Sequence, residues 1–336
     1  MPEPLLEVKD LHVSFPTEDG IVKAVGGVSF SLQAGETLGV VGESGSGKSV
    51  SFLTVMGLIS RKQAVIEGSV LFQGQDLVQM DNEELRQIRG AKIAMIFQDP
   101  MTSLHPFYKV GDQIAEMILA HEEISKKEAG DRAVEMLRRV NIPQPKERAD
   151  QYPHEFSGGM RQRAMIAMAL SLNPDLLIAD EPTTALDVTV QAQILELIDR
   201  LQSEFNTAVA LITHDLGVVA EHCDRIQVMY AGKIVEEGSE DDIYYRPMMP
   251  YTWGLLRSIP RLGHDTDRLT PIMGSPPSLI FLPDGCSFSP RCPYVFDECH
   301  LSDPDLLPLD GHHAARCHLS QEERERIVAA EILAPS

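Results

Sequence analysis

The stretch Gly42-Glu43-Ser44-Gly45-Ser46-Gly47-Lys48-Ser49 decides the fold of this 336-residue chain. It fits the P-loop pattern, and it follows an apolar run and precedes a predicted helix, as that pattern requires. Its glycines let backbone N–H groups turn inward to hold phosphate oxygens, and the helix start adds its positive dipole end. We predict that Lys48 reaches the β and γ phosphates and that Ser49 binds Mg²⁺. The alternative is a glycine-rich turn that matches by chance.

The segments around this stretch predict an α/β fold. Residues 37–41, 176–179 and 208–212 are short, continuously apolar runs, which is typical of strands buried on both faces of a mainly parallel sheet. Apolar residues at helical spacing from Val190 to Phe205, with Asp187 as the capping residue, predict a helix between the last two strands.

Other segments predict the parts that flank this sheet. Residues 5–15, 24–32, 68–72 and 225–235 alternate apolar and polar side chains, as expected of antiparallel strands with one solvated face. The stretch from about 100 to 172 is mostly helical. A helical insertion therefore interrupts the α/β core.

A strand that ends in two carboxylates supports a nucleotide site. Residues 176–181 have the form of a Walker B segment, which would place Asp180 near Mg²⁺ and Glu181 near the attacking water. Alone, such a segment is often only a strand that meets solvent. Here it follows a P-loop in the same chain.

The stretch Ser157-Gly158-Gly159-Met160-Arg161-Gln162 opens a predicted helix and forms a second anion-binding helix start, with an ordinary helix cap as the alternative. Gln98 follows the strand 92–97, residues 185–187 follow the Walker B segment, and His214 follows the strand 208–212. The order of these elements resembles the ATP-binding cassette (ABC) ATPases over roughly residues 5–240.

The resemblance implies a cassette over residues 1–240. It would contain a mainly parallel core sheet, an antiparallel β subdomain and a helical subdomain at about 100–172. It also implies that two such ATPase domains pair head to tail and bury two ATP molecules between them. Each P-loop would then face the signature of the other subunit.

The resemblance also implies a role for single residues. Phe15 would stack on adenine, although a core phenylalanine is the alternative. Gln98 would sense Mg²⁺ and the γ-phosphate, His214 would contact the γ-phosphate, and Glu181 would be the general base. The signature that completes the partner's site is Ser157, Gly158 and Gly159, and it departs from the commoner form at Phe156 and Met160.

Composition excludes other classes of protein. The chain has 29 Lys+Arg against 50 Asp+Glu, a formal net charge of −21, which argues against nucleic-acid binding. No membrane-spanning run or signal peptide is visible, so we expect a cytosolic protein whose five cysteines are free, catalytic or metal-bound rather than in disulfides.

The last 96 residues, 241–336, differ in composition from the rest. They hold 12 of the 22 prolines, no lysine and four of the five cysteines. Pro250-Tyr251-Thr252 and the cysteines resemble the carboxy-terminal extension of ATPase subunits from dipeptide and oligopeptide importers. The segment 98–104 resembles the same subfamily, with His105 where asparagine is usual.

Four cysteines of this extension are candidate metal ligands, namely Cys286, Cys292, Cys299 and Cys317. Four thiolates can hold an iron–sulfur cluster or a zinc ion, and either would stabilise a small module with little core. Some members of the resembled subfamily carry a [4Fe–4S] cluster, which we favour over zinc and over free or disulfide-bonded thiols. We expect Cys223 to be a core residue. Four histidines of the extension could substitute as ligands, but we expect them to be solvated, namely His300, His312, His313 and His318.

The predicted function is ATP hydrolysis that energises dipeptide and oligopeptide import, through dimer closure coupled to membrane subunits. The implied partners are an identical or paralogous ATPase subunit, two transmembrane permease subunits and an external substrate-binding protein. Residues 99–110 would meet the permeases, and the chain would lie at the cytoplasmic face of the membrane. The alternatives are an importer of nickel or glutathione, a soluble ABC ATPase acting on DNA or ribosomes, and a redox protein.

Overall fold

The structure is a computed structural model that describes residues 3–99, 103–184, 186–258 and 271–332. The chain divides into two compact units. The first, here the Walker B unit, comprises Met1–Leu5, Leu32–Glu36 and Gln79–Ile212; the second, here the P-loop unit, comprises Leu6–Ser31, Thr37–Val78 and Thr213–Ser336.

The Walker B unit contains three parallel strands in the order β6-β7-β8. Their bounds are β6 Ile93–Ile96, β7 Leu176–Asp180 and β8 Ala208–Thr213. Every residue of β7 and β8 is buried, which confirms the prediction of strands covered on both faces. The helix α8, Val188–Phe205, joins β7 to β8, and Asp187 caps it by accepting a 3.0 Å hydrogen bond from the amide of Val190.

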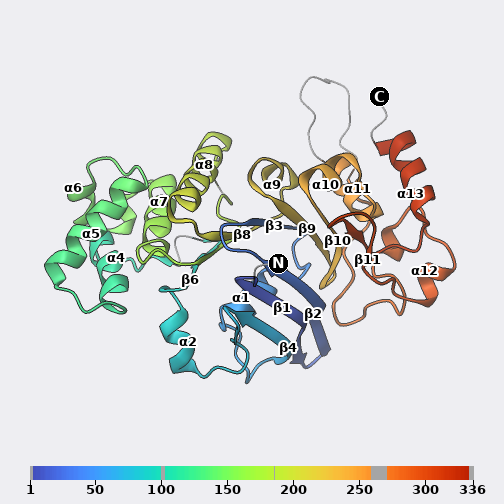
Figure 1. Ribbon diagram of the computed structural model, residues 1–336, viewed down its shortest axis with the longest axis horizontal. Coiled ribbons are helices and arrows are strands. Elements are labelled where there is room, and N and C mark those ends of the chain that lie inside the picture. Colours follow the sequence, from blue (N-terminus) through green and yellow to red (C-terminus); the bar gives the residue numbers. More distant parts are fainter. Residues whose placement is uncertain (1–2, 100–102, 185, 259–270, 333–336) are drawn as a thin grey trace. The chain divides into compact units, whose positions relative to one another are not determined.

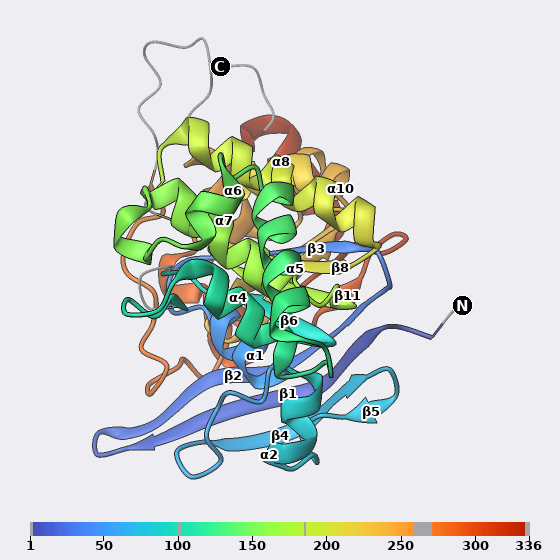
Figure 2. The ribbon, with the colours of Figure 1, turned by 90° about the vertical axis from the view of Figure 1, so that its left-hand side faces the viewer.

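Helices make up most of the remaining Walker B unit, as predicted. They are α2 Asn82–Ile88, α4 Val110–Leu119, α5 Lys126–Arg139, α6 Pro145–Ala149, the 3₁₀ turn η1 Pro153–Glu155 and α7 Gly158–Ala169. Figures 1 and 2 show α4, α5, α6 and α7 as one group of neighbouring helices. Ala129, Ala133 and Leu137 form the buried stripe of α5, so this group has an apolar interior of its own.

The P-loop unit also contains a parallel pair, β3 Thr37–Val41 with β9 Arg225–Tyr230. Here the sequence prediction of one half-solvated strand over 225–235 is wrong. The chain turns back at Ala231–Gly232, both with positive φ, and continues as β10 Lys233–Gly238 antiparallel to β9. Pairing with β3 and β10 buries β9, and the short strands β12 Ala314–Ala315 and β11 Leu307–Pro308 extend this side of the sheet.

A separate antiparallel sheet completes the amino-terminal part of this unit, as predicted. Its order is β2-β1-β4-β5, with bounds Gly20–Leu32, Leu6–Thr17, Val65–Phe72 and Gln75–Asp76. Figure 2 shows β1, β2 and β4 side by side. Leu6, Val8, Leu11 and Val13 of β1 are buried while their neighbours are more exposed, so one face of the strand forms core.

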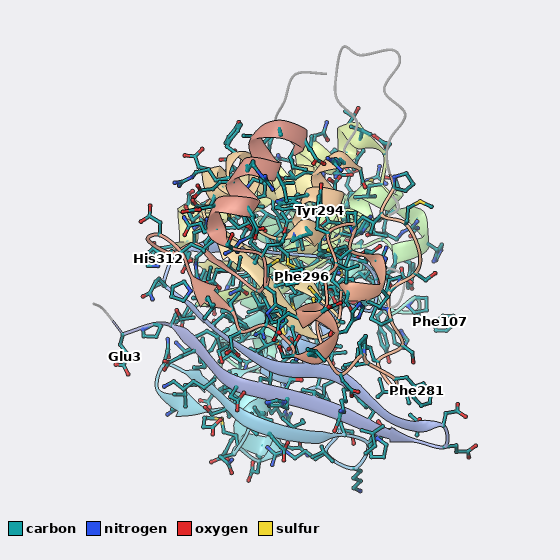
Figure 3. All side chains as sticks on the ribbon, turned by 90° about the vertical axis from the view of Figure 1, so that its right-hand side faces the viewer. Glu3, Phe107, Phe281, Tyr294, Phe296 and His312 are labelled. Carbon is teal, nitrogen blue, oxygen red and sulfur yellow. The ribbon has the colours of Figure 1, made fainter. Side chains whose placement is uncertain are left out.

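The carboxy-terminal region consists of short elements. They are α9 Leu216–His222, α10 Glu240–Tyr245, α11 Pro250–Arg257, η2 Ser289–Arg291, α12 Glu298–Leu301, α13 Gln321–Ile327 and the π-helical turn η3 Val328–Ile332. Its apolar cluster is small, with Trp253 packed against Ile327, Val328 and Ile332. Tyr294, labelled in Figure 3, packs on this cluster.

A buried contact between a histidine and a carboxylate corrects a prediction. His313 is 4% exposed, and its Nε2 lies 2.9 Å from a carboxylate oxygen of the fully buried Glu236. The same carboxylate accepts hydrogen bonds from the amides of Met248 and Met249. His318 is also partly buried, and its Nε2 lies 2.9 Å from the carbonyl oxygen of Ser302. The prediction that these two histidines are solvated is therefore wrong. Among the described residues, no helix is long and apolar enough to cross a membrane.

Candidate active site

Two glycines of the P-loop lie so close to neighbouring backbone atoms that a side chain would not fit there. Gly42 has φ +155°, and a Cβ there would lie 2.2 Å from the carbonyl oxygen of Met229. Gly47, the N-cap of α1 Lys48–Val55, has φ +99°, and a Cβ would lie 2.5 Å from the carbonyl oxygen of Ala24. A larger residue at either position would displace the loop from β9 or β2.

The open side of the loop is the side on which an anion can bind. Ser44 and Gly45 are exposed, and a Cβ on Gly45 would meet nothing within 4 Å. Within the described chain no side chain caps α1, so the amides of its first turn remain available to a ligand. The stretch therefore forms the loop between a strand and a helix that its sequence predicts.

The side chain of Lys48 folds back into the loop and is hydrogen-bonded to its backbone. Its Nζ donates to the carbonyl oxygens of Gly42 at 2.6 Å and Glu43 at 3.0 Å, and it lies 3.4 Å from Oγ of Ser46. Only 4% of the residue is exposed. The carbonyl oxygens therefore hold the amino group of Lys48 inside the loop, where a phosphate would bind.

Two other residues predicted to meet ATP lie in the same unit. Phe15 is near the end of β1 and is only partly buried, so it is not one of the core phenylalanines. His214 directly follows β8 and is exposed. Both are accessible to a ligand.

The Walker B unit brings together a second group of polar side chains. Asp180 ends β7 and is 7% exposed, and Glu181 follows it with φ +47°. One carboxylate oxygen of Glu181 accepts hydrogen bonds from Nε2 of Gln98 at 2.9 Å and from Oγ1 of Thr184 at 2.8 Å. Few non-glycine residues have a positive φ. Those that do are found disproportionately at functional sites.

Thr184 is a site residue that sequence reasoning missed. The sequence did contain a sign of this role, because the hydroxyl of Thr184 comes three residues after Glu181, a spacing that a tight turn brings together. The turn is present: the amide of Thr184 donates to the carbonyl oxygen of Glu181 at 3.1 Å. Ala185 lies outside the described residues.

The signature stretch forms the start of α7. Oγ of Ser157 accepts a 3.3 Å hydrogen bond from the amide of Met160, and Gly158 and Gly159 are the first residues of the helix. Gln162, 2% exposed, donates to the carbonyl oxygen of Pro182, next to Glu181. The helix that begins at the signature is therefore anchored to the Walker B turn within one unit.

The four cysteines of the extension are mutually close without forming a compact metal site. None of the five cysteines, all of which the structure describes, forms a disulfide. Burial, with a smaller contribution from the thiols of Cys317, Cys286 and Cys299, raises the pKa of the Cys292 thiol to about 12. Within the described ranges, no three His, Cys, Asp or Glu side chains converge tightly enough to hold a metal ion.

A repeated backbone contact surrounds three of these sulfurs. The amide of Phe288 donates to the sulfur of Cys286, and the same spacing recurs from Tyr294 to Cys292 and from Leu319 to Cys317. Burial raises the pKa of Cys286 and brings that of Cys317 to about 11, while these N–H donors act in the opposite direction. Such donors stabilise a thiolate once a ligand has displaced the proton.

Two family models match the chain. Residues 25–184 match the model described as ABC transporter, and residues 235–299 match the model described as oligopeptide/dipeptide transporter, C-terminal region.

Curated relatives match over nearly the whole length. The chain is 52% identical over 320 residues to the oligopeptide transport ATP-binding protein OppD of Haemophilus influenzae, which covers 95% of this chain and 98% of that protein. It is 53% identical over 327 residues to the dipeptide transport ATP-binding protein DppD of Bacillus subtilis, covering 97% and 98%.

Solved structures of similar fold cover the cassette. The ATP-binding cassette MJ0796, dimeric and bound to ADP and Pi in a post-hydrolysis state, superposes with a TM-score of 0.63 at 28% identity. That match covers 70% of this chain and 98% of the other. The cbiO1 protein of Clostridium perfringens, part of a cbiONQ ABC transporter complex, gives 0.62 at 26% identity, covering 73% and 92%.

Proposed function

Because this chain belongs to the family of ATP-binding subunits of oligopeptide and dipeptide ABC transporters, we propose residue by residue how it hydrolyses ATP and couples hydrolysis to peptide import. The observation that carries this proposal is the P-loop cradle around Lys48 in a chain with an importer-type extension. The two matched ranges support a cassette over residues 1–240 and an extension over 241–336.

The P-loop unit supplies the phosphate cradle. We assign the triphosphate to the loop amides and Lys48, adenine to Phe15, and the γ-phosphate contact to His214. Within the P-loop unit, Ser49 offers an oxygen ligand for Mg²⁺, and the ion would neutralise phosphate charge when bound. The Walker B unit has oxygen ligands for Mg²⁺ of its own in Asp180 and Gln98. The cradle around Lys48 and the exposure of Ser44 and Gly45 support this assignment.

Glu181 is the proposed general base. It would accept a proton from water as the water oxygen bonds to the γ-phosphorus and the bond to the leaving ADP breaks. The hydrogen bonds from Gln98 and Thr184 to one oxygen of Glu181 would orient the other oxygen toward the water. The proton then leaves with phosphate or solvent, which restores the carboxylate.

A second ATPase subunit, identical or paralogous, would complete each site. Ser157, Gly158 and Gly159 would contact the ATP held by the partner subunit, at the start of α7. The dimeric state of the similar MJ0796 cassette supports this pairing. Closure of the dimer on ATP and its opening after hydrolysis would be the mechanical output.

Two permease subunits and an external binding protein would supply the membrane path, so the chain would lie at the cytoplasmic face. In the predicted contact segment 99–110, Phe107 is 82% and Tyr108 57% exposed, while residues 100–102 lie outside the described ranges. Figure 3 shows the ring of Phe107 projecting away from the ribbon. Exposed aromatic rings suit a contact with another subunit.

The four cysteines would hold a [4Fe–4S] cluster that acts as a structural cross-link. A zinc ion needs four sulfurs at about 2.3 Å from one centre, whereas an inorganic cluster core separates its ligands more widely. The support for this proposal is that the thiols of Cys292 and Cys317 lie near enough to the other cysteines of the group for their pKa values to be affected. Among the described residues, no group compact enough to hold a metal ion is found.

The test is reconstitution of the chain with its partner subunits in vesicles, followed by ATP-dependent uptake of labelled dipeptides and oligopeptides. Uptake of peptides that stops when Lys48 is replaced by alanine is the expected result. Uptake of nickel or glutathione instead would change the substrate class. A chain that fails to bind permeases but binds nucleic acid would support a soluble factor and overturn the proposal.

A further inference from the structure

Glu43, the second residue of the P-loop, is held by the carboxy-terminal extension. Its carboxylate accepts two hydrogen bonds from the Arg291 guanidinium, at 2.6 and 3.0 Å. Its amide donates to the hydroxyl of Tyr251 at 2.9 Å, and its carbonyl oxygen accepts the bond from Lys48. The backbone and the side chain of this one loop residue are therefore both fixed, and two of the fixing groups come from outside the cassette.

Arg291 is built into this position. Besides Glu43, it donates to the carbonyl oxygens of Met273 at 3.0 Å and Ile272 at 3.3 Å, and to the hydroxyl of Tyr230 at 3.4 Å. These bonds occupy all five N–H donors of a guanidinium. The side chain is 3% exposed, and its bonds to Glu43 raise the pKa of Arg291, so it stays charged.

An aromatic cluster supports the contact. The rings of Tyr230, Tyr251 and Phe288 lie 4.6 to 5.4 Å apart between centroids, and all three residues are buried. Burial raises the pKa of Tyr251, so its hydroxyl stays neutral and can accept the amide hydrogen of Glu43. The turn η2 that ends at Arg291 lies between Cys286 and Cys292, so the cysteine module carries this arginine.

A carboxylate in this loop opposes the loop's proposed ligand. ATP carries several negative charges, and an unpaired Glu43 would repel them at short range in a partly buried site. An arginine paired with both oxygens cancels that charge and holds the carboxylate in one orientation. The P-loop thus keeps the positive potential of its amides and Lys48.

We propose that Arg291 is a positioning residue for the P-loop, through which the extension sets the affinity of the cassette for nucleotide by neutralising and orienting Glu43. This inference rests on the proposed role of the P-loop in binding ATP. It assigns the extension a part in the nucleotide site, in addition to its cysteines.

The test is a double-mutant cycle on the full-length chain, read by titration with ATP. Arg291→Met should weaken ATP binding about tenfold, because the negative charge of Glu43 is then unpaired. Glu43→Gln should bind ATP several-fold more tightly, since Arg291 is then uncompensated beside the cradle. Arg291→Met with Glu43→Gln should return to near the original affinity, which a merely structural contact would not do.

Further variants separate the possible outcomes. Arg257→Met is the matched control, because Arg257 also pairs with a carboxylate in the extension, Glu331, and it should leave ATP binding unchanged. If Arg291→Met does not fold, the ATP affinity of Glu43→Gln alone tests the inference. ATP binding by Glu43→Gln that is unchanged or weaker than in the original chain overturns it. If Lys48→Ala leaves ATP binding intact, the proposed function itself fails. If Lys48→Ala loses ATP binding, and the effects of Arg291→Met and Glu43→Gln on ATP affinity simply add in the double variant, only the role of Arg291 is rejected.

Discussion

Nε2 of Gln98 donates a 2.9 Å hydrogen bond to the carboxylate of Glu181, 83 residues further along the chain. One end of this contact follows β6, and the other follows β7, which pairs with β6 in parallel register. The carboxyl ends of neighbouring parallel strands meet at one edge of a sheet, so the contact follows from the topology. A change at Gln98 can therefore reach the proposed general base directly.

Replacing Glu181 with glutamine should abolish turnover while ATP binding is kept. The amide is isosteric but cannot accept a proton from water, so we expect ATP hydrolysis to fall by about a hundredfold or more. ATP should then trap a closed dimer, measurable by size-exclusion chromatography with and without ATP. Glu204→Gln, which removes a surface carboxylate of the same unit, is the control. Unchanged turnover in Glu181→Gln would reject its role as base.

Thr184→Val should slow hydrolysis about three- to tenfold with ATP affinity unchanged, because it removes a hydrogen bond that, together with the one from Gln98, orients Glu181. Thr184→Ser keeps the hydroxyl and should restore most of the rate. Steady-state kinetics that separate kcat from KM make the measurement. Equal rates for the valine and serine variants would show that the hydroxyl does not matter.

Lys48→Ala should act on binding rather than on chemistry alone. The variant loses the one side-chain ammonium inside the described loop, so ATP affinity should fall by about a hundredfold, measured by nucleotide titration. Lys62→Ala, an exposed position beyond α1, is the control and should bind ATP normally. Tight binding by Lys48→Ala contradicts the assignment of the cradle.

Cys292→Ser should destabilise the extension more than the cassette. Serine is a poor ligand for iron, so the iron and sulfide content of the protein should fall. The temperature of the lower of two thermal transitions should fall as well. Cys223→Ser makes the same substitution outside the four-cysteine group and should change neither. Iron content is measured on anaerobically purified protein. An unaltered melting profile and no metal in the original chain would mean that these thiols bind nothing.

Glu236→Ala should destabilise the carboxy-terminal region by about 3 kcal/mol or more, because it leaves buried donors without an acceptor. These donors are the amides of Met248 and Met249 and the ring of His313. Denaturant unfolding measures the loss, and Glu240→Ala at an exposed position of α10 should stay close to the original stability. A loss below about 1 kcal/mol would show that water replaces the carboxylate.

The nucleotide-binding stretches were predictable because each depends on local chemistry. Gly42 and Gly47 adopt positive φ, the apolar runs of β3, β7 and β8 are buried strands, and Asp187 caps α8 as expected. The strand over 225–235 was predicted wrongly, because alternation does not reveal a turn at Ala231–Gly232 or a buried partner on each side of β9. His313 was predicted wrongly because its partner Glu236 lies 77 residues away in the sequence.

The sequence by itself determined the P-loop, the Walker B strand, the signature helix and the family, because glycine spacing, apolar runs and capping residues act over a few neighbours. Only the tertiary structure decided that Arg291 and Tyr251 hold Glu43, that Thr184 supports Glu181, and that His313 is buried against Glu236. Contacts between Glu43 and Arg291 join positions 248 residues apart. No local pattern encodes such a pair, because charge and burial select it only after the chain has folded.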